Sequence, residues 1–271
     1  MVYLFLEAKA MSTVFVTLSD ISYYPRGLRT VQELRDNGKW IGDIVYIAVD
    51  FEPQLPPDVI VYKTKHIDTS GLLESFRKNP IKPMPDNRHF GKLYQWDKLQ
   101  VFKTYFRQWD RVVFVDAGLR IFDSVQPLLD LPWKGKFLGP DDADPYDNGN
   151  RFRTQLDLEA NPEARELLFS EFPTKILASR YFNNCIFVFD TQLTYQTSFE
   201  EMEEYMNKFP IFMCNETGLM NMMFNFKLGV WDPFPQLTAG GKYLFGWAEN
   251  NYRENPNWES FHFIKYSLTR A

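Results

Sequence analysis

The sequence has few cysteines, no basic tract and no long apolar run, and each absence excludes a class of protein. Its two cysteines, Cys185 and Cys214, lie in different kinds of segment and lack the close spacing of a metal site. A disulfide framework is therefore not expected, and a reducing compartment fits this cysteine usage better. With a net charge of −5 and no clustered Lys and Arg, the chain does not predict a nucleic-acid partner.

The apolar segments are too short for a membrane protein. None approaches the roughly 18 residues of a spanning helix, so no membrane span is expected. The first twenty or so residues include Glu7 and have no basic flank before their short apolar run, which does not match a signal peptide. A cytoplasmic location is the resulting expectation.

The residues that are abundant point to a folded domain. Hydrophobic residues make up 45% of the 271 residues and aromatic residues 17%. A chain of this length and composition buries a sizeable core, and without a flexible linker we expect one domain over residues 1–271. Core packing is the ordinary account of the aromatic surplus, and a homodimer face is the alternative.

Short apolar segments alternate with helical patterns along the chain. Strand-like runs cover residues 12–18, 44–49, 59–62, 112–115, 136–138 and 184–189, and helical spacing covers residues 27–37 and 95–109. Later helices are expected after Asn161, which precedes a Pro, after Ser198, which forms a capping box with Glu201, and at Glu216. This alternation predicts an α/β fold with an open, mostly parallel sheet flanked by helices.

One strand ends in a carboxylate followed by the two smallest residues. The run RVVFV leads directly to Asp116, Ala117 and Gly118. Asp and Gly are common in turns, which is one interpretation. The other is a carboxylate presented to a metal or a ribose, since ligands of open α/β sheets bind at the carboxyl ends of the strands.

The order of short motifs resembles glycogenin and the glycosyltransferase family 8 enzymes. The first strand ends in Thr-Leu-Ser and is followed by Tyr24-Pro-Arg-Gly27. A Lys-Leu helix, VVFVDAG, YFNNCIFVF, ETGLMN and FHF then follow in the order of the family's motifs. The resemblance covers most of residues 13–266. It implies a GT-A fold, Rossmann-like with an open mixed sheet, and an insertion around residues 140–182 that shapes the acceptor site.

In the family, the first strand binds the nucleoside of a nucleotide-diphospho-sugar, usually a UDP-sugar. The resemblance therefore places Thr17, Leu18 and Ser19 in the uridine pocket. It places Tyr24 against the uracil ring, where stacking on an aromatic face contributes roughly 1–3 kcal/mol.

The resemblance implies a divalent cation on the diphosphate, Mn²⁺ or else Mg²⁺. Asp116 falls on the first Asp of the family's Asp-x-Asp and His262 on its late His ligand. Oxygen together with imidazole suits Mn²⁺, and the metal would neutralise the departing diphosphate. Ala117 and Gly118 would let the diphosphate approach the backbone, and Lys98 falls on a Lys beside the sugar nucleotide.

Three further residues are candidates for catalysis, and one more is a candidate for binding a phosphate. Glu216 replaces an Asp near the anomeric carbon, and a helix cap is an equally good interpretation of it. Asn183 and Asn184 suit hydrogen bonds to sugar hydroxyls, with Asn183 on the family's Asn. Lys265 reaches a phosphate only by analogy, because the family's Gly-x-x-Lys-Pro-Trp motif is absent.

The largest departure from the family is Gly118, which stands where the second Asp ligates the metal. Three explanations are open. Asp116 and His262 hold the cation with the diphosphate and water, or Asp141 or Asp142 supplies the missing oxygen, or the nucleotide binds without metal.

Together these observations predict a retaining, metal-assisted glycosyltransferase. It would move a hexose, glucose or galactose, from a UDP-sugar to a hydroxyl of a glycan or protein acceptor. The alternative is a catalytically weak or inactive nucleotide-sugar-binding module. A nucleotidyltransferase is less favoured, because no Gly-rich loop follows the first strand.

Overall fold

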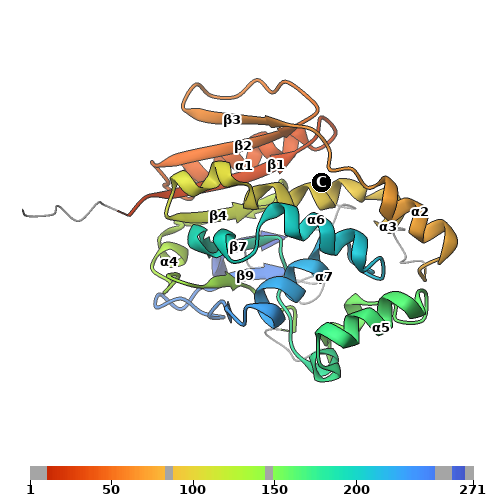
Figure 1. Ribbon diagram of the computed structural model, residues 1–271. Helices are drawn as coiled ribbons and strands as arrows, with labels where there is room; N and C mark the ends of the chain where they lie inside the picture. The colour runs from red at the N-terminus through yellow and green to blue at the C-terminus, as the bar shows by residue number, and fades with distance from the viewer. Residues whose placement is uncertain (1–10, 83–87, 144–148, 248–257, 266–271) are drawn as a thin grey trace, which may run out of the picture.

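A seven-stranded mixed sheet forms the centre of the computed structural model, which describes residues 11–82, 88–143, 149–247 and 258–265 (Figure 1). The strand order is β3-β2-β1-β4-β7-β6-β8. β1 to β4 are parallel, β7 runs antiparallel to β4 and β6, and β8 is parallel to β6. The expected α/β fold is confirmed. The strands are β1 (Thr13–Ser19), β2 (Asp43–Val49), β3 (Val59–Thr64), β4 (Arg111–Val115), β6 (Phe137–Gly139), β7 (Ile186–Asp190) and β8 (Trp231–Pro233).

A second, three-stranded sheet lies beside the first, in the order β5-β10-β9. Its strands are β5 (Leu119–Ile121), β9 (Tyr243–Trp247) and β10 (Phe261–Lys265). β10 pairs antiparallel with β5 and parallel with β9. Because β5 begins three residues after Asp116, this small sheet brings the end of the described chain to the carboxyl end of β4.

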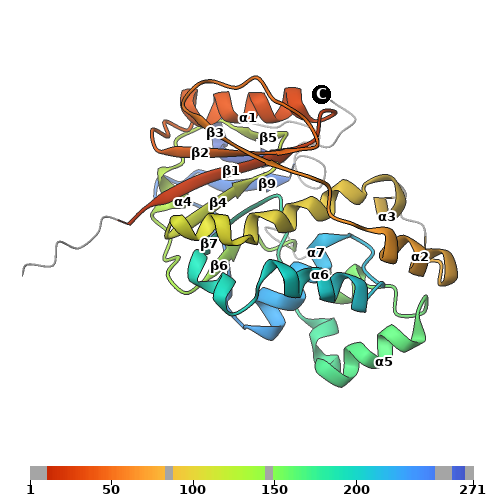
Figure 2. The ribbon, with the colours of Figure 1, turned by 45° about the horizontal axis from the view of Figure 1, so that its top comes forward.

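Helices and the small sheet cover the two faces of the main sheet. α1 (Tyr24–Asp36) and the small sheet pack on one face, where Val31 and Phe263 share a core with Phe15. Helices that include α6 (Phe199–Lys208) and α7 (Glu216–Met220) cover the other face, with Met206 and Met220 in its core. Figure 2 shows α1 on one side of the sheet and α5, α6 and α7 on the other.

The remaining helices are short. They are α2 (Ser70–Lys78), α3 (Arg88–Gly91), α4 (Gln126–Leu129), α5 (Pro162–Glu171), α6 (Phe199–Lys208) and α7 (Glu216–Met220), with a π-helical turn η6 (Asn221–Lys227) continuing α7. Three predicted starts are confirmed, because α5 follows Asn161, α6 follows Ser198 and α7 begins at Glu216. Asn161 Oδ1 accepts from Ala164 N–H at 3.1 Å, and Ser198 Oγ accepts from Glu201 N–H at 3.1 Å.

The helix predicted over residues 95–109 is wrong in its form. The structure has two 3₁₀ segments, η1 (Leu93–Phe102) and η2 (Thr104–Gln108), separated by the extended residue Lys103 with ψ 153°. Trp96, Leu99 and Phe102 are all buried and recur every three residues, which is the repeat of a 3₁₀ helix. The predicted apolar residues are therefore buried, but their spacing of three residues is that of a 3₁₀ helix and not of an α-helix.

Aromatic side chains fill the core. Phe187, for example, lies 4.8 Å from Phe114 and 5.0 Å from Phe137 between ring centroids, and all three are buried. The aromatic surplus is therefore accounted for by packing inside the chain, and it does not require a homodimer face.

Gly27 lets the first turn of α1 approach β2. A Cβ at this position would lie 2.2 Å from the hydroxyl of Tyr46, which is itself buried and hydrogen-bonded to Ser19 Oγ at 2.5 Å. Because Tyr46 cannot turn away without breaking that bond, glycine is required here for contact between helix and strand. The Tyr-x-x-Gly step thus has a packing reason.

We expect Gly27→Ala to lower the free energy of unfolding by about 1–3 kcal/mol, the cost of overpacking a filled core. Gly91→Ala is the matched control, since a Cβ there meets nothing within 4 Å. Urea unfolding of both variants measures the difference. A loss as large in Gly91→Ala would assign the effect to glycine replacement in general.

Candidate functional site

The Asp-Ala-Gly sequence forms a tight turn between β4 and β5. Asp116 N–H donates to the carbonyl of Cys185 at 2.9 Å, and its own carbonyl accepts from Leu119 N–H at 3.0 Å. Gly118 has φ +99°, which side-chain-bearing residues rarely adopt, and its N–H donates to Thr30 Oγ1 at 3.2 Å. The turn therefore holds the Asp116 carboxylate at the carboxyl end of β4.

Two lysines from distant segments hold that carboxylate. Lys98 of η1 places Nζ 3.1 Å from Asp116 Oδ1, and Lys265 of β10 places Nζ 2.8 Å from Asp116 Oδ2. The side chains of Lys98 and Asp116 are 9% and 19% exposed. Both carboxylate oxygens are thus paired with ammonium groups in a largely dry environment.

Glu216 and Asn184 complete the arrangement. Glu216 is the first residue of α7, and its Oε1 lies 3.0 Å from Lys98 Nζ and accepts from Asn184 Nδ2 at 3.0 Å. The Thr217 hydroxyl donates to Asn184 Oδ1 at 3.1 Å. Glu216 Oε2 is buried and has no hydrogen-bond partner among the described residues. We call Lys98, Asp116, Asn184, Glu216 and Lys265 the charged cluster.

The pKa values reflect this pairing. Burial alone would lower the pKa of Lys98, but the carboxylates of Asp116 and Glu216 outweigh burial and raise it. Burial would likewise raise the pKa of Asp116, but the ammonium groups of Lys265 and Lys98 bring it below its ordinary value. Lys98 and Asp116 therefore both stay charged at neutral pH.

Backbone strain lies next to Glu216. Asn215 has φ 49° and ψ −127°, an unfavourable conformation for any residue with a side chain. Its Nδ2 donates to Gln95 Oε1 at 2.9 Å and to the Lys92 carbonyl at 3.1 Å, so the start of η1 and the residue before it hold Asn215 in place. Such strain occurs at functional sites, where surrounding contacts maintain it. No sequence pattern indicated it.

Asn183 lies in a neighbouring network with the acidic loop. Its Oδ1 accepts from Cys185 N–H at 3.0 Å, and its Nδ2 donates to Asp142 Oδ1 at 3.2 Å. Tyr181 donates its hydroxyl to the other oxygen of Asp142 at 2.6 Å. Asp141, in turn, pairs with Arg180 at 2.8 Å. Each of these loop carboxylates therefore has protein partners of its own.

His262 is placed away from Asp116. It lies three residues before Lys265 on β10, and residues an odd number apart on a strand face opposite ways. Because Lys265 points to Asp116, His262 points to the other face, where its Nδ1 lies 2.9 Å from the carbonyl oxygen of Ser124. Within the described ranges, no three His, Cys, Asp or Glu side chains gather as a metal site would require.

The residues predicted to hold the nucleoside lie at the ends of β1 and α1. Thr17 is buried and its Oγ1 has no partner in the described part of the chain, whereas Ser19 is bonded to Tyr46. Tyr24 donates its hydroxyl to the carbonyl of Gln54, and its ring lies 5.4 Å from that of Phe51, at 62°. Leu18 and Ala117 are half-buried. Their binding roles stay predictions.

Sequence reasoning missed three residues beside the turn. The hydroxyls of Tyr23 and Tyr94 lie 2.9 Å apart, and the Arg26 guanidinium carbon lies 5.3 Å from the Tyr23 ring centroid. Burial, Tyr23, Asp20 and Asp116 all raise the pKa of Tyr94, which places it near the charged cluster. Arg26 is part of the Tyr-Pro-Arg-Gly motif, but it was overlooked because only the Tyr and the Gly of that motif match the family.

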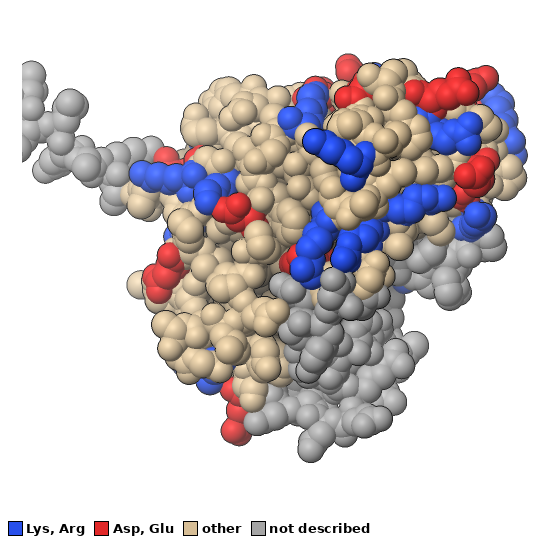
Figure 3. All heavy atoms as spheres, turned by 90° about the horizontal axis from the view of Figure 1, so that it is seen from below, with Lys and Arg blue, Asp and Glu red and all other residues tan. Residues whose placement is uncertain are grey.

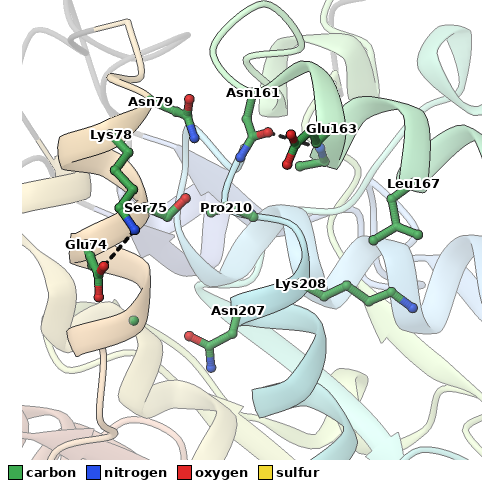
Figure 4. Close-up of a pocket in the computed structure, with 12 residues that line it drawn as sticks. Glu74, Ser75, Lys78, Asn79, Asn161, Glu163, Leu167, Asn207, Lys208 and Pro210 are labelled. Carbon is green, nitrogen blue, oxygen red and sulfur yellow. Dashed lines mark hydrogen bonds and ion pairs between the residues drawn. The ribbon is translucent and has the colours of Figure 1, made fainter.

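A pocket lies away from the charged cluster. A polar pocket of about 470 Å³ opens between α2, α5 and α6 (Figure 4), and Lys78, Asn79, Asn161, Glu163, Asn207 and Lys208 are among its lining residues. It contains no member of the charged cluster. On the face in Figure 3, Lys and Arg are interspersed with Asp and Glu. None of the helices in the described ranges is long and apolar enough to span a membrane.

Breaking the charged cluster is expected to be costly. Lys98→Met leaves Glu216 buried without its cation, and removing one partner of a buried ion pair costs about 3–5 kcal/mol of unfolding free energy. Lys78→Met, which breaks only the surface pair of Lys78 with Glu74 on α2, is the matched control and should change little. Denaturant unfolding at pH 7 measures both.

The cost of Lys98→Met should also depend on pH. The lowered pKa of Asp116 contributes stability above its unfolded value of about 3.9, and this is lost as the pH falls through the folded pKa. The raised pKa of Lys98 contributes below about pH 10.4, and this is lost as the pH rises through the folded pKa. The difference from wild type should therefore be largest between about pH 4 and 10. If the difference in unfolding free energy between wild type and Lys98→Met did not shrink at low pH, the ion-pair explanation would be contradicted.

The chain resembles solved glycosyltransferases in its fold. It matches the galactosyltransferase LgtC, solved with donor and acceptor sugar analogues, with a TM-score of 0.59 at 12% identity, over 93% of this chain and 86% of that one. It matches the mannosyltransferase Ktr4p of S. cerevisiae, solved with GDP, with a TM-score of 0.50 at 11% identity, over 80% of this chain and 66% of that one.

A third match covers less than half of the other protein. The chain aligns over 96% of its own length with the bifunctional glycosyltransferase WbbM, but over 46% of that chain, with a TM-score of 0.57 and 12% identity. No protein-family model and no curated protein matches the sequence. At these identities the likeness concerns the fold, which is the GT-A fold of nucleotide-sugar glycosyltransferases.

Proposed function

We propose that this chain is a retaining glycosyltransferase that moves a hexose, glucose or galactose, from a UDP-sugar to a hydroxyl of a glycan or protein acceptor. The observation that carries the proposal is the charged cluster at the carboxyl end of β4, with one buried oxygen of Glu216 left unpaired. In an open α/β sheet this edge is where ligands bind. A galactosyltransferase and a mannosyltransferase on the same fold support a sugar-nucleotide donor.

The proposed reaction exchanges one C–O bond for another on the same sugar face. The bond between the anomeric carbon and the diphosphate breaks, the acceptor oxygen bonds to that carbon, and the acceptor's proton passes to the departing diphosphate. Glu216 Oε2 would accept a hydrogen bond from the donor sugar or stabilise positive charge at its anomeric carbon. Asn184 orients Glu216 through its bond to Oε1, while Asn183 would contact the acceptor side.

The proposed reaction does not include the predicted Mn²⁺ or Mg²⁺, because the residues predicted to bind the metal are not arranged as its ligands. Both oxygens of Asp116 are paired with lysines, and His262 points to the opposite face of β10. Asp141 and Asp142, the other suggested oxygen donors, are engaged by Arg180 and Tyr181. The acceptor role of residues 140–182 remains part of the proposal.

The test is release of UDP or GDP from a panel of UDP- and GDP-sugars, with simple saccharides as acceptors and with product analysed for anomeric configuration. We expect turnover of UDP-glucose or UDP-galactose with retention. Glu216→Gln, which keeps the shape and removes the charge, should lower kcat about 100-fold or more, as loss of a transition-state contact does. Glu204→Gln, at an exposed position of α6 outside residues 140–182, is the control.

One result would contradict the proposed activity, and another would contradict the role of Glu216 in it. Nucleotide binding without turnover of any sugar would favour the alternative, a nucleotide-sugar-binding module. Turnover that Glu216→Gln leaves unchanged would remove Glu216 from the reaction and leave its structural role as the first residue of α7.

A further inference from the structure

The Asp116 carboxylate is occupied on both sides by ammonium groups. Lys98 lies 3.1 Å from Oδ1 and Lys265 2.8 Å from Oδ2. A cation bound through Asp116 would have to share the carboxylate with two ammonium groups or displace at least one of them. The same geometry suits an anion, because it brings positive charge to one edge of the sheet.

The two lysines differ in how many donors they have left. Lys98 Nζ lies within 3.2 Å of four acceptor atoms, on Asp116, Glu216 and Asn184, and an ammonium has three protons. Lys265 has Asp116 as its one side-chain partner within the described ranges, so two of its protons remain available. Lys98 is therefore a positioning residue, and Lys265 is the lysine able to bind a ligand.

A third cation lies over the turn. A Cβ on Gly118 would stand 3.4 Å from Arg26 Cδ, so the Arg26 side chain passes beside the position where the family's second Asp would project. Arg26 is half-buried against the Tyr23 ring, and no carboxylate in the described part of the chain pairs with it. An arginine with free donors here suits a phosphate, which it binds in a two-point geometry.

We propose that Lys265 and Arg26 hold the diphosphate of the sugar nucleotide, with Asp116 positioning Lys265, and that the nucleotide binds without a divalent cation. This inference rests on the proposed function, because it names how the same site carries its donor. In this arrangement the two side chains donate charge-assisted hydrogen bonds to the departing diphosphate and offset its growing negative charge.

The first experiment is calorimetric titration of metal-stripped protein with UDP and with GDP, once in EDTA and once in millimolar Mn²⁺. We expect binding in EDTA that Mn²⁺ tightens by less than about threefold. Binding at least tenfold tighter in Mn²⁺ would overturn the inference while leaving the proposed function standing. Absence of nucleotide binding in both conditions would overturn both. This measurement needs no variant.

The second experiment locates the phosphate contacts. Lys265→Met and Arg26→Met should each weaken UDP binding in EDTA about 10- to 100-fold, the change expected for one hydrogen bond to a charged group. Both should leave uridine binding unchanged, because uridine has no phosphate. Equal losses for UDP and uridine would show a structural effect and overturn the assignment.

The control cation lies at the other end of the sheet. Lys136 precedes β6, pairs with Asp232 and accepts through its carbonyl from Asp190 N–H, at the far end of β7 from the charged cluster. Lys136→Met removes the same charge there and should leave UDP binding unchanged. A loss equal to that in Lys265→Met would show that net charge alone controls affinity, against the proposed contacts.

Gly118→Asp tests the same inference from the opposite direction. With φ +99° and Arg26 alongside, an Asp here is strained and its carboxylate would pair with Arg26. We expect weaker UDP binding in EDTA and no gain of Mn²⁺ dependence. A variant that binds UDP more tightly with Mn²⁺ than wild type does would show that the site is a metal site lacking one ligand, and would overturn the inference.

Discussion

A carboxylate shared by two lysines connects the parts of this structure. Asp116 stands at the end of the central strand β4, Lys98 reaches it from η1 on one face, and Lys265 reaches it from β10 in the small sheet. Lys98 continues the connection to Glu216 at the start of α7. A buried charge without a partner is costly, so each of these segments must keep its place for the others to stay stable.

That arrangement also leaves particular polar groups unpaired in the described part of the chain. Asp116 and Lys98 pair with each other and with further charged groups, while Glu216 Oε2 and the remaining donors of Lys265 have no partners among the described residues. The strained backbone at Asn215 keeps Glu216 at the first position of α7. The groups left over are thus held in fixed positions by the groups that are paired, which is the preorganisation that stabilising a developing charge requires.

Local patterns in the sequence pointed to most residues of the charged cluster, but their contacts depend on the tertiary structure. Asp116, Asn184 and Glu216 could be singled out because each stands near the end or start of a recognisable element, whereas Lys98, in the middle of η1, was singled out by the resemblance alone. Whether His262 or Lys265 contacts Asp116 depends on which face of β10 meets the turn. That face is set by the register in which β10 pairs with β5, which the sequence does not reveal. The 3₁₀ form of η1 was likewise hidden, since apolar residues three apart also fit one face of an α-helix.

The departures from the family pattern are physically consistent with one another. Gly118 removes a carboxylate at a φ where a side chain would be strained, and Arg26 fills the adjoining space with a cation that no described carboxylate neutralises. Lys265 stands on the face of β10 that meets Asp116, and His262 on the other. A site that loses metal ligands while keeping only its anionic groups would repel a diphosphate. Here the positions around Asp116 instead carry positive charge, which is the electrostatic condition for holding that group by side chains alone.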